Sequence, residues 1–342
     1  EARGSIVKMT SLAKSGHPGG SMSTIDFMLT LYNMINIDPH DPKMETRDRV
    51  IISHGHTSPA AYSTLASCGF FNIEDAISQF RLAGSIFEGH VEPDVPGIEW
   101  ASGNLGQGLW AGCGFALANK LKNIDSHTFV LMGDGEQQKG QLAEARRFAV
   151  KFNLNITAFV DYNQLQICGD VNEVMPQYIL ENYISDGWDV IEIDGHDLIE
   201  IRDAILDAVQ NEKPTVIIGH TIMGKGVSFM ENKEKYHGSP LSEEQLAKAL
   251  EELGLENDIE EYKDLRNNFD ASSSKHDEET NLDFDIDLGK PIIYKDKTDN
   301  RSAWGNAIAD IASKIEDAPI VVLDCDLQGS VKTKEFEAVL PQ

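Results

Sequence analysis

The sequence predicts an α/β fold in which a parallel sheet carries helices on both faces. The first observation is that short apolar runs alternate with helix-compatible segments along most of the 342 residues. The second is the run 128–132, which is apolar and ends in Gly-Asp-Gly, a pattern typical of a buried parallel strand. In such a sheet, ligands are expected at the carboxyl ends of the strands.

Each expected element follows from its local pattern. Strands are expected where β-branched and other apolar residues run together between Gly-rich or polar turns, and helices where a longer segment has helical periodicity. The expected strands are 50–52, 128–132, 156–160, 188–193, 214–218 and 320–323, and the expected helices are 105–121, 138–152, 198–209 and 303–315.

Composition limits the class of protein. The chain is 41% hydrophobic and 8% aromatic, and no apolar run approaches the roughly 18 residues needed to cross a bilayer. Its first residues lack the apolar stretch of a signal peptide, and its four cysteines are far apart with no CxxC pair. We therefore expect a cytoplasmic protein with neither a zinc site nor a disulfide framework.

The charge is strongly negative. A formal net charge of −27 argues against nucleic acid or an anionic membrane as a partner. Part of the acidity lies in 250–287, which is interpreted as a helix followed by a solvated linker. A phosphate ligand would need this field to be reversed locally by a metal, histidine or arginine.

Two polar side chains are expected at neighbouring strand ends. Asp134 follows one expected strand and Asn163 lies just beyond the next, so both can converge at one sheet edge. Carboxylate and amide oxygens suit Mg²⁺ or Ca²⁺, and Gly133 and Gly135 allow close approach of a ligand. Taken alone, the same residues are equally compatible with two ordinary turns.

The neighbouring motifs decide between these interpretations. Gly-Asp-Gly followed by Asn at this spacing is similar to the thiamine diphosphate motif, and the whole set resembles the transketolase family. The matching segments, in chain order, are Ser-Gly-His-Pro-Gly-Gly at 15–20, Ser-His-Gly-His at 53–56, Gly-His at 89–90, Ser-Gly-Asn-Leu-Gly-Gln-Gly at 102–108, Gly-Asp-Gly at 133–135, Asp-Tyr-Asn-Gln-Leu-Gln-Ile at 161–167, Met-Gly-Lys-Gly-Val-Ser-Phe at 223–229 and His-Gly-Ser-Pro at 237–240.

The resemblance implies a cofactor site for thiamine diphosphate and Mg²⁺ or Ca²⁺. The metal ligands would be Asp134, Asn163 and the backbone of Leu165. His56 would lie by the diphosphate, and backbone groups at Gly103 and Leu105 would hold the aminopyrimidine ring. The remaining cofactor contacts would come from Gly135, His237 and Asp326.

The resemblance also implies substrate residues. His17 and His237 would contact a donor ketose and move its hydroxyl protons, and His90 would lie beside the substrate. Neutral imidazoles can exchange protons near pH 7 without large pKa shifts. Arg301 and Ser330 would hold a sugar phosphate, although Arg301 is also compatible with a surface charge at a helix start.

The other histidines match no motif of the family. His40, His127, His220 and His276 are expected to be structural or solvent-facing. His196 lies in a strand-to-helix turn, where a capping role is more typical than a catalytic one.

By the same resemblance, 1–255 is a diphosphate-binding domain, 256–295 an acidic linker and 296–342 the start of a pyrimidine-binding domain. The family's catalytic glutamate motif would begin at about the point where this sequence ends. Two residues depart from the family pattern. Lys139 replaces a usual glutamate, for which Glu136 or Glu144 could substitute, and Ala143 replaces a bulkier aromatic residue.

The implied activity is that of a transketolase, which moves a two-carbon glycolaldehyde unit from a ketose phosphate to an aldose phosphate. The active site would form between the subunits of a homodimer. Two alternatives remain open at this point: another thiamine diphosphate enzyme, such as a deoxyxylulose phosphate synthase or a decarboxylating dehydrogenase subunit, and a cofactor-binding subunit that is inactive without a partner chain. The sequence leaves the exact sugars undetermined.

Overall fold

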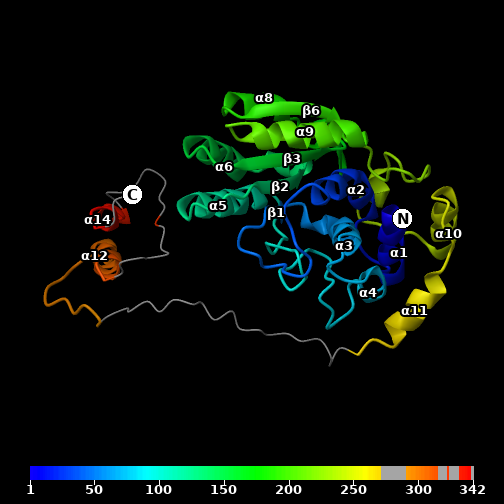
Figure 1. Ribbon diagram of the computed structural model, residues 1–342, viewed down its shortest axis with the longest axis horizontal. Coiled ribbons are helices and arrows are strands. Elements are labelled where there is room, and N and C mark those ends of the chain that lie inside the picture. The colour runs from blue at the N-terminus through cyan, green and yellow to red at the C-terminus, as the bar shows by residue number, and fades with distance from the viewer. Residues whose placement is uncertain (271–289, 315–321, 323–330, 340–342) are drawn as a thin grey trace. The chain divides into compact units, whose positions relative to one another are not determined.

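The computed structural model describes residues 1–270, 290–314, 322 and 331–339. The chain divides into two compact units, residues 1–276 and 277–342, and each is considered by itself (Figure 1). The expected strand at 320–323, except residue 322, lies outside the described residues, as do the expected site residues Asp326 and Ser330 and His276.

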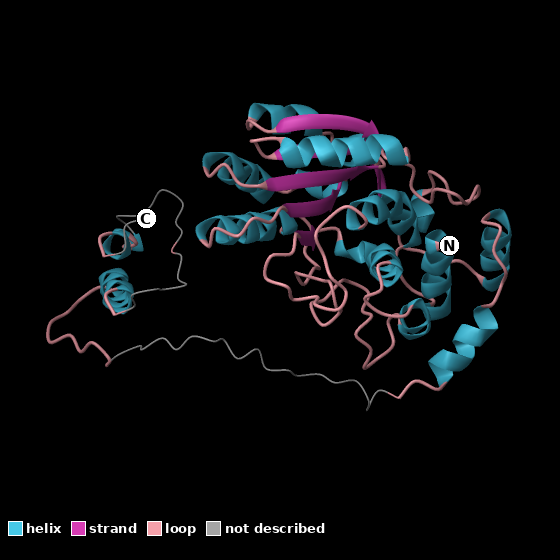
Figure 2. Ribbon diagram, in the orientation of Figure 1, coloured by secondary structure: helices cyan, strands magenta, loops and turns pink. Residues whose placement is uncertain are grey.

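The first unit is built on a five-stranded sheet with the order β1-β2-β3-β7-β6 (Figure 2). Each neighbouring pair is parallel. The predicted α/β fold with a parallel sheet is therefore confirmed. The strands are β1 (Arg49–Ile52), β2 (Thr128–Gly133), β3 (Ile156–Tyr162), β6 (Asp189–Asp194) and β7 (Thr215–His220), and a separate antiparallel pair comprises β4 (Leu165–Gln166) and β5 (Gly169–Asp170).

Alternating residues of each strand enter two different cores. In β2, Phe129 and Leu131 belong to one hydrophobic cluster, whereas Val130 and Met132 belong to the other. Because successive side chains of a strand point to opposite faces, an apolar run without polar interruptions requires helices on both faces. The central strands are therefore buried on both sides, as the 128–132 pattern predicts.

Helices cover both faces of the sheet (Figure 1). One cluster holds side chains of α5 (Gly108–Leu121), α6 (Gly140–Lys151) and α8 (Ile179–Ser185). The other cluster holds side chains of α1 (Ala2–Ala13), α2 (Pro18–Tyr32), α3 (Ser58–Ser67), α4 (Ile73–Gln79), α9 (Leu198–Gln210), α10 (Glu243–Glu252) and α11 (Ile259–Asn267). Shorter helical segments are η1 (Gly55–Thr57), η2 (Gly135–Gln138), α7 (Val171–Val174) and η3 (Glu234–His237).

The acidic segment is more structured than the sequence indicated. A capping box between Ser242 and Gln245 starts α10. The next helix, α11, lies within the range expected to be a linker, yet Arg266 donates from Nη1 to the carbonyls of Ser78 and Phe80 at 2.8 and 2.9 Å. These contacts attach α11 to the end of α4, so at least this part of the acidic segment belongs to the first unit.

The second unit contains α12 (Asn300–Ala312) and α14 (Lys334–Glu337). Asp299 caps α12 by accepting a hydrogen bond from the Ser302 backbone N–H at 2.9 Å. A Cβ at Gly305 would lie 2.5 Å from Cβ of Lys332, so α12 closely approaches the residues before α14. Nowhere in the described part of the chain is there a helix that is long and apolar enough to span a membrane.

Candidate cofactor and substrate site

Four parallel strands deliver polar residues to one edge of the sheet. The segment after β1 carries His54 and His56, β2 leads into Asp134, β3 into Asn163, and β7 into Thr221. A cavity of about 170 Å³ opens at this edge and is lined by residues from the first three of these segments, together with His237. A cavity therefore lies at the strand ends, where the sequence predicts a ligand.

Asp134 is a buried acid of this cavity whose pKa is strongly raised. Its side chain is 3% exposed, and its Oδ2 accepts a hydrogen bond of 2.5 Å from the backbone N–H of Gln164. Burial, and secondarily the nearby Asp161 carboxylate, raises the pKa of Asp134 to about 8. A buried carboxylate with no cation beside it is costly, so this position favours a positively charged ligand.

Asn163 presents its amide in a defined orientation. Its Nδ2 donates to Asp161 Oδ2 at 3.3 Å and to Ser23 Oγ at 3.4 Å. Its Oδ1 accepts one bond of 3.0 Å from the backbone N–H of Leu165. An amide oxygen has two lone pairs, so Oδ1 keeps one for a further ligand.

The donor set fits a divalent cation with a bound anion. Within the residues that the structure describes, no cluster of three or more His, Cys, Asp or Glu side chains could hold a metal. A cation here would take the Asp134 carboxylate and the Asn163 amide oxygen, with other ligands from backbone or bound oxygens. Three buried nitrogens of the cavity residues lack partners: His54 Nδ1, His237 Nδ1 and Gln166 Nε2. Unpartnered nitrogens beside a cation position suit the oxygens of a diphosphate.

Four of the predicted histidines form one cluster. The ring centroid of His17 lies 5.0 Å from that of His56, 6.3 Å from His90 and 5.7 Å from His237. The His56 and His237 centroids are 5.4 Å apart. The structure therefore brings together residues that are more than 200 positions apart in the sequence, and places them beside the cavity of Asp134.

The pKa values of these imidazoles are shifted further than the sequence predicts. Burial is the main cause that lowers the pKa of His17, to about 4, and the charges of His237 and Arg81 add to it. Burial likewise lowers the pKa of His56, His90 and His237. The sequence predicts proton exchange without large pKa shifts, whereas burial lowers the pKa of these imidazoles in the chain itself. An anion bound nearby would move each pKa back up.

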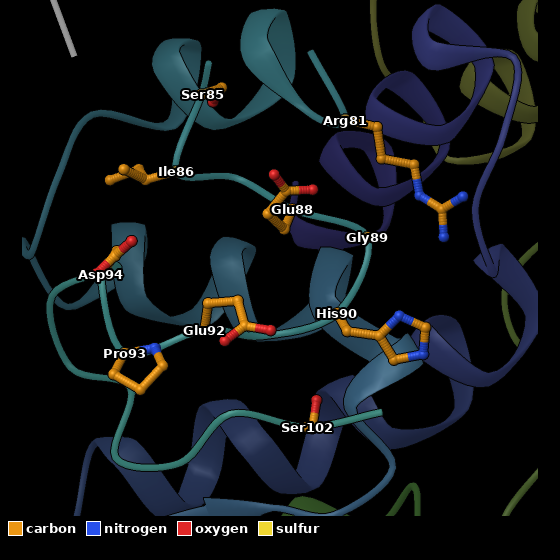
Figure 3. A pocket seen from close by; sticks show the side chains of 10 residues that line it. All are labelled: Arg81, Ser85, Ile86, Glu88, Gly89, His90, Glu92, Pro93, Asp94 and Ser102. Carbon is orange, nitrogen blue, oxygen red and sulfur yellow. The ribbon is translucent and has the colours of Figure 1, made fainter. Parts of the chain in front are cut away.

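A larger opening of about 820 Å³ lies next to this cluster (Figure 3). Arg81 and His90 line it together with the acidic residues Glu88, Glu92 and Asp94. The guanidinium of Arg81 is held by a 2.6 Å hydrogen bond from Nη1 to Ser15 Oγ. Sugar hydroxyls and phosphates are both compatible with such a lining.

Glu136 is a buried acid that lies between the cofactor motifs. Its Oε2 accepts from Ser53 Oγ at 2.5 Å and from the Gly106 N–H at 2.6 Å, and its Oε1 accepts from the Gly133 N–H at 2.9 Å. Burial raises its pKa to about 7, partly opposed by these bonds. Lys139 lies beside Gly106, where an added Cβ would be 2.6 Å from Lys139 Cγ. Of the two acids considered as substitutes at position 139, Glu136 is buried, whereas Glu144 is exposed.

Two expected cofactor contacts lie in the loop before α5. Leu105 lines the cavity, whereas Gly103 is exposed and a Cβ there would meet nothing within 4 Å in this chain. Gly135 lines the cavity, and a Cβ there would lie 3.3 Å from the Gln166 side chain. Arg301 is exposed on α12 in the second unit. The part that these residues play in binding stays a prediction.

The remaining histidines have structural surroundings. His127 is buried and pairs through Nε2 with Thr157 Oγ1 at 2.7 Å, whereas His40 and His220 are exposed. The capping role expected for His196 is wrong, because the neighbouring Asp197 caps α9. His196 instead accepts a 2.8 Å bond at Nε2 from the Ile222 N–H and contacts Asp26 Oδ2 through Nδ1 at 2.7 Å.

Sequence reasoning missed the residues that support the site. Asp161 lies near the end of β3, two positions before Asn163, which directly follows the strand. The alternation of the strand, continued by one residue, indicates that both face one side. Arg81 lies outside every motif. Ser23 and Thr221 reach Asp161 from distant segments, and no local pattern of the sequence signals them.

Comparison with known proteins agrees with this architecture. Residues 3–290 match the family model described as transketolase, thiamine diphosphate binding domain. One of the subunits of the apulose-4-phosphate transketolase of Phocaeicola vulgatus is 39% identical over 254 residues, which cover 72% of this chain and 89% of that protein. Human transketolase is 30% identical over 347 aligned residues, covering 98% of this chain and 53% of the relative, so the chain spans about half of that longer protein.

Solved structures give the same result. The crystal structure of transketolase from Campylobacter jejuni superposes with a TM-score of 0.84 at 29% identity, covering 97% of this chain and 57% of that one. The family model covers most of the sequence and includes the strand-end cavity and the histidine cluster. The chain therefore belongs to the transketolase family, through that family's thiamine diphosphate-binding domain.

Proposed function

We propose that this chain binds thiamine diphosphate through a divalent cation and serves a transketolase that transfers a two-carbon unit between sugar phosphates. The observation that carries the proposal is the convergence of Asp134 and Asn163 at the ends of adjacent strands, in a cavity next to four clustered histidines. The family membership supports the cofactor, and the geometry supports the assignment of the metal ligands.

The cation is proposed to lie between the Asp134 carboxylate and Asn163 Oδ1, with the backbone carbonyl of Leu165 as a third protein ligand. Mg²⁺ and Ca²⁺ both prefer such oxygen ligands. The positive charge offsets the cost of burying Asp134, and the buried nitrogen atoms of His54 and His237 donate toward the diphosphate. His56, Gly103, Leu105 and Gly135 complete the proposed cofactor contacts.

Bound thiamine diphosphate supplies the electron sink that allows a carbon–carbon bond next to a ketose carbonyl to break. The chain's own residues position the sugar and hold its protons. A neutral imidazole offers one N–H donor and one acceptor nitrogen, so it can both give and take a hydroxyl proton. His17 and His237 are proposed to contact the hydroxyl groups of the donor and to move their protons. His90 and Arg81 are proposed to line the opening through which the donor enters.

The identity of the partner is a separate proposal. A homodimer in which the second subunit completes each site is one assembly. The other is a pair of different chains, which is favoured by one observation: two relatives at 39% identity are named as transketolase subunits. One of these relatives is named for apulose 4-phosphate and the other for 6-deoxy-6-sulfofructose, so the donor need not be an ordinary pentose phosphate.

The test is an activity assay on the complete protein that contains this chain, with Mg²⁺ and thiamine diphosphate. Xylulose 5-phosphate, apulose 4-phosphate and 6-deoxy-6-sulfofructose are offered as donors with ribose 5-phosphate as acceptor, and pyruvate is the control donor. Two-carbon transfer from one of the sugars supports the proposal. Turnover of pyruvate, together with no turnover of any of the three sugars, would overturn the proposal in favour of another thiamine diphosphate enzyme.

A further inference from the structure

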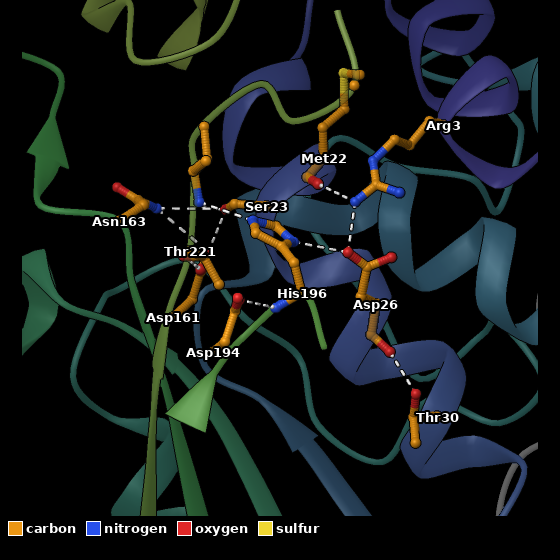
Figure 4. Close-up of polar contacts among 12 residues, drawn as sticks. Arg3, Met22, Ser23, Asp26, Thr30, Asp161, Asn163, Asp194, His196 and Thr221 are labelled. Atoms are coloured by element: carbon orange, nitrogen blue, oxygen red, sulfur yellow. Dashed lines mark hydrogen bonds and ion pairs between the residues drawn. The ribbon is translucent and has the colours of Figure 1, made fainter. Parts of the chain in front are cut away.

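We infer that Asp161 is a positioning residue for the proposed metal site, fixing the Asn163 amide so that its oxygen faces the cation. This inference rests on the proposed function, because it concerns a ligand of the same site. Asp161 lies on β3, paired in register with Gly133 of β2, and is 1% exposed (Figure 4).

The carboxylate of Asp161 is already engaged by protein donors. Thr221 donates from its hydroxyl to Oδ1, and Ser23 donates from Oγ to Oδ2 at 2.5 Å. Asn163 Nδ2 is a third donor, at 3.3 Å from Oδ2. Three protein donors are therefore directed at its two oxygens, and its contact with Asn163 links Asp161 to the proposed cation position.

The orientation of the Asn163 amide follows from this arrangement. If the amide turned by half a rotation, Oδ1 would face the Asp161 carboxylate, and two acceptors would stand within hydrogen-bonding distance without a proton between them. The same rotation would place the NH₂ group next to the backbone N–H of Leu165, which donates to Oδ1 at 3.0 Å. Both neighbours therefore select one orientation, in which the remaining lone pair of Oδ1 is free for a cation.

Ser23 and Thr221 fix Asp161 in turn. They come from α2 and from the loop after β7, so Asp161 joins three elements behind the site. A second carboxylate, Asp26, lies in the adjoining network, where it accepts from Arg3 and pairs with His196 rather than with Asn163 (Figure 4). Asp26 therefore provides a matched control for the loss of one negative charge.

The experiment measures the Mg²⁺ dependence of thiamine diphosphate binding by isothermal titration calorimetry, with Mg²⁺ varied at fixed cofactor. Residues that orient a metal ligand without contacting the metal typically contribute about 10- to 100-fold in metal affinity. Asp161→Asn is expected to weaken Mg²⁺ binding by about that factor, whereas Asp26→Asn should stay within about twofold of the wild type. Thermal unfolding of each variant confirms that it is folded.

A swap variant separates orientation from a general structural effect. In Asp161→Asn with Asn163→Asp, the carboxylate at 163 offers an oxygen in either orientation, and the amide at 161 can donate to it. The swap variant should bind Mg²⁺ at least tenfold more tightly than Asp161→Asn does. Equal Mg²⁺ affinity in Asp161→Asn and wild type would overturn the inference, as would a swap that fails to recover. A wild-type complete protein, assembled with its partner subunit, that binds no cofactor in Mg²⁺ would instead overturn the proposed function itself.

Discussion

Arg81 donates a 2.6 Å hydrogen bond from Nη1 to the hydroxyl of Ser15, and so links the loop that carries His90 to the segment that carries His17. The guanidinium also lies against Gly89, where an added Cβ would be 2.5 Å from Cζ. Among the described residues that line the larger opening, Arg81 is the single arginine or lysine. It is thus the local positive charge in a strongly acidic chain.

Replacing Arg81 by Ala should raise KM for a phosphorylated donor by about tenfold or more, since a hydrogen bond to a charged group contributes about 1.5 kcal/mol or more. Ser15→Ala should have a smaller effect in the same direction, because the guanidinium loses its anchor but remains. Steady-state kinetics of the complete protein measures this. Arg202→Ala is the control, since Arg202 is exposed and pairs with its neighbour Asp203. Unchanged KM in Arg81→Ala would show that this cation does not take part in binding.

Two glycines of α5 should respond oppositely to the same substitution. A Cβ at Gly112 would lie 2.3 Å from Val130 Cγ2, whereas a Cβ at Gly114 would meet nothing within 4 Å. Gly112→Ala should destabilise the chain by about 1–3 kcal/mol through overpacking against β2. Gly114→Ala should stabilise it by about 0.5–1 kcal/mol, because alanine loses less backbone entropy in a helix. Urea unfolding measures both, and equal effects would contradict this packing.

Acid should destabilise the chain through buried neutral histidines, and His127 isolates the effect because it lies away from the cavity. Burial lowers its pKa from 6.5 to about 4. Between those values the unfolded chain binds a proton that the folded chain does not, so stability is present above pH 6.5 and is lost as the pH falls toward 4.

A shift of that size corresponds to about 3 kcal/mol at most. His127→Gln, whose amide can still pair with Thr157, should therefore lose less stability than the wild type between pH 6.5 and 4. Urea unfolding at several pH values gives the result, and parallel curves for His127→Gln and wild type would contradict the argument.

The fold class could be predicted from the sequence because the central strands are short and mostly apolar. Residues 128–132 could be recognised as a doubly buried parallel strand, and the placement of Asp134 and Asn163 at neighbouring strand ends followed from the length of one crossover. The histidine cluster could be predicted only from the resemblance to a known family. His17 and His237 meet through tertiary packing, which no local pattern of the sequence encodes.

The contacts that support the site could not be predicted from the sequence. Asp161 becomes informative only when Ser23 and Thr221 are seen to donate to it. His196 was assigned to a cap because capping is decided locally, whereas its actual partners, Asp26 and Ile222, come from other segments. The pKa shift of His17 depends on burial among other histidines, which composition and spacing do not report.

The central claim is that a cation on Asp134 and Asn163 holds the cofactor. Calorimetric titration of thiamine diphosphate into the complete protein that contains this chain tests it most directly. The wild type should bind in Mg²⁺ and lose binding in excess chelator, and Asp134→Ala should not bind in either condition. Removing a buried acid whose pKa is already raised to about 8 should leave the fold intact, and the exposed Glu144→Gln is the control. Cofactor affinity that is unchanged in Asp134→Ala, or in the wild type without Mg²⁺, would contradict the account.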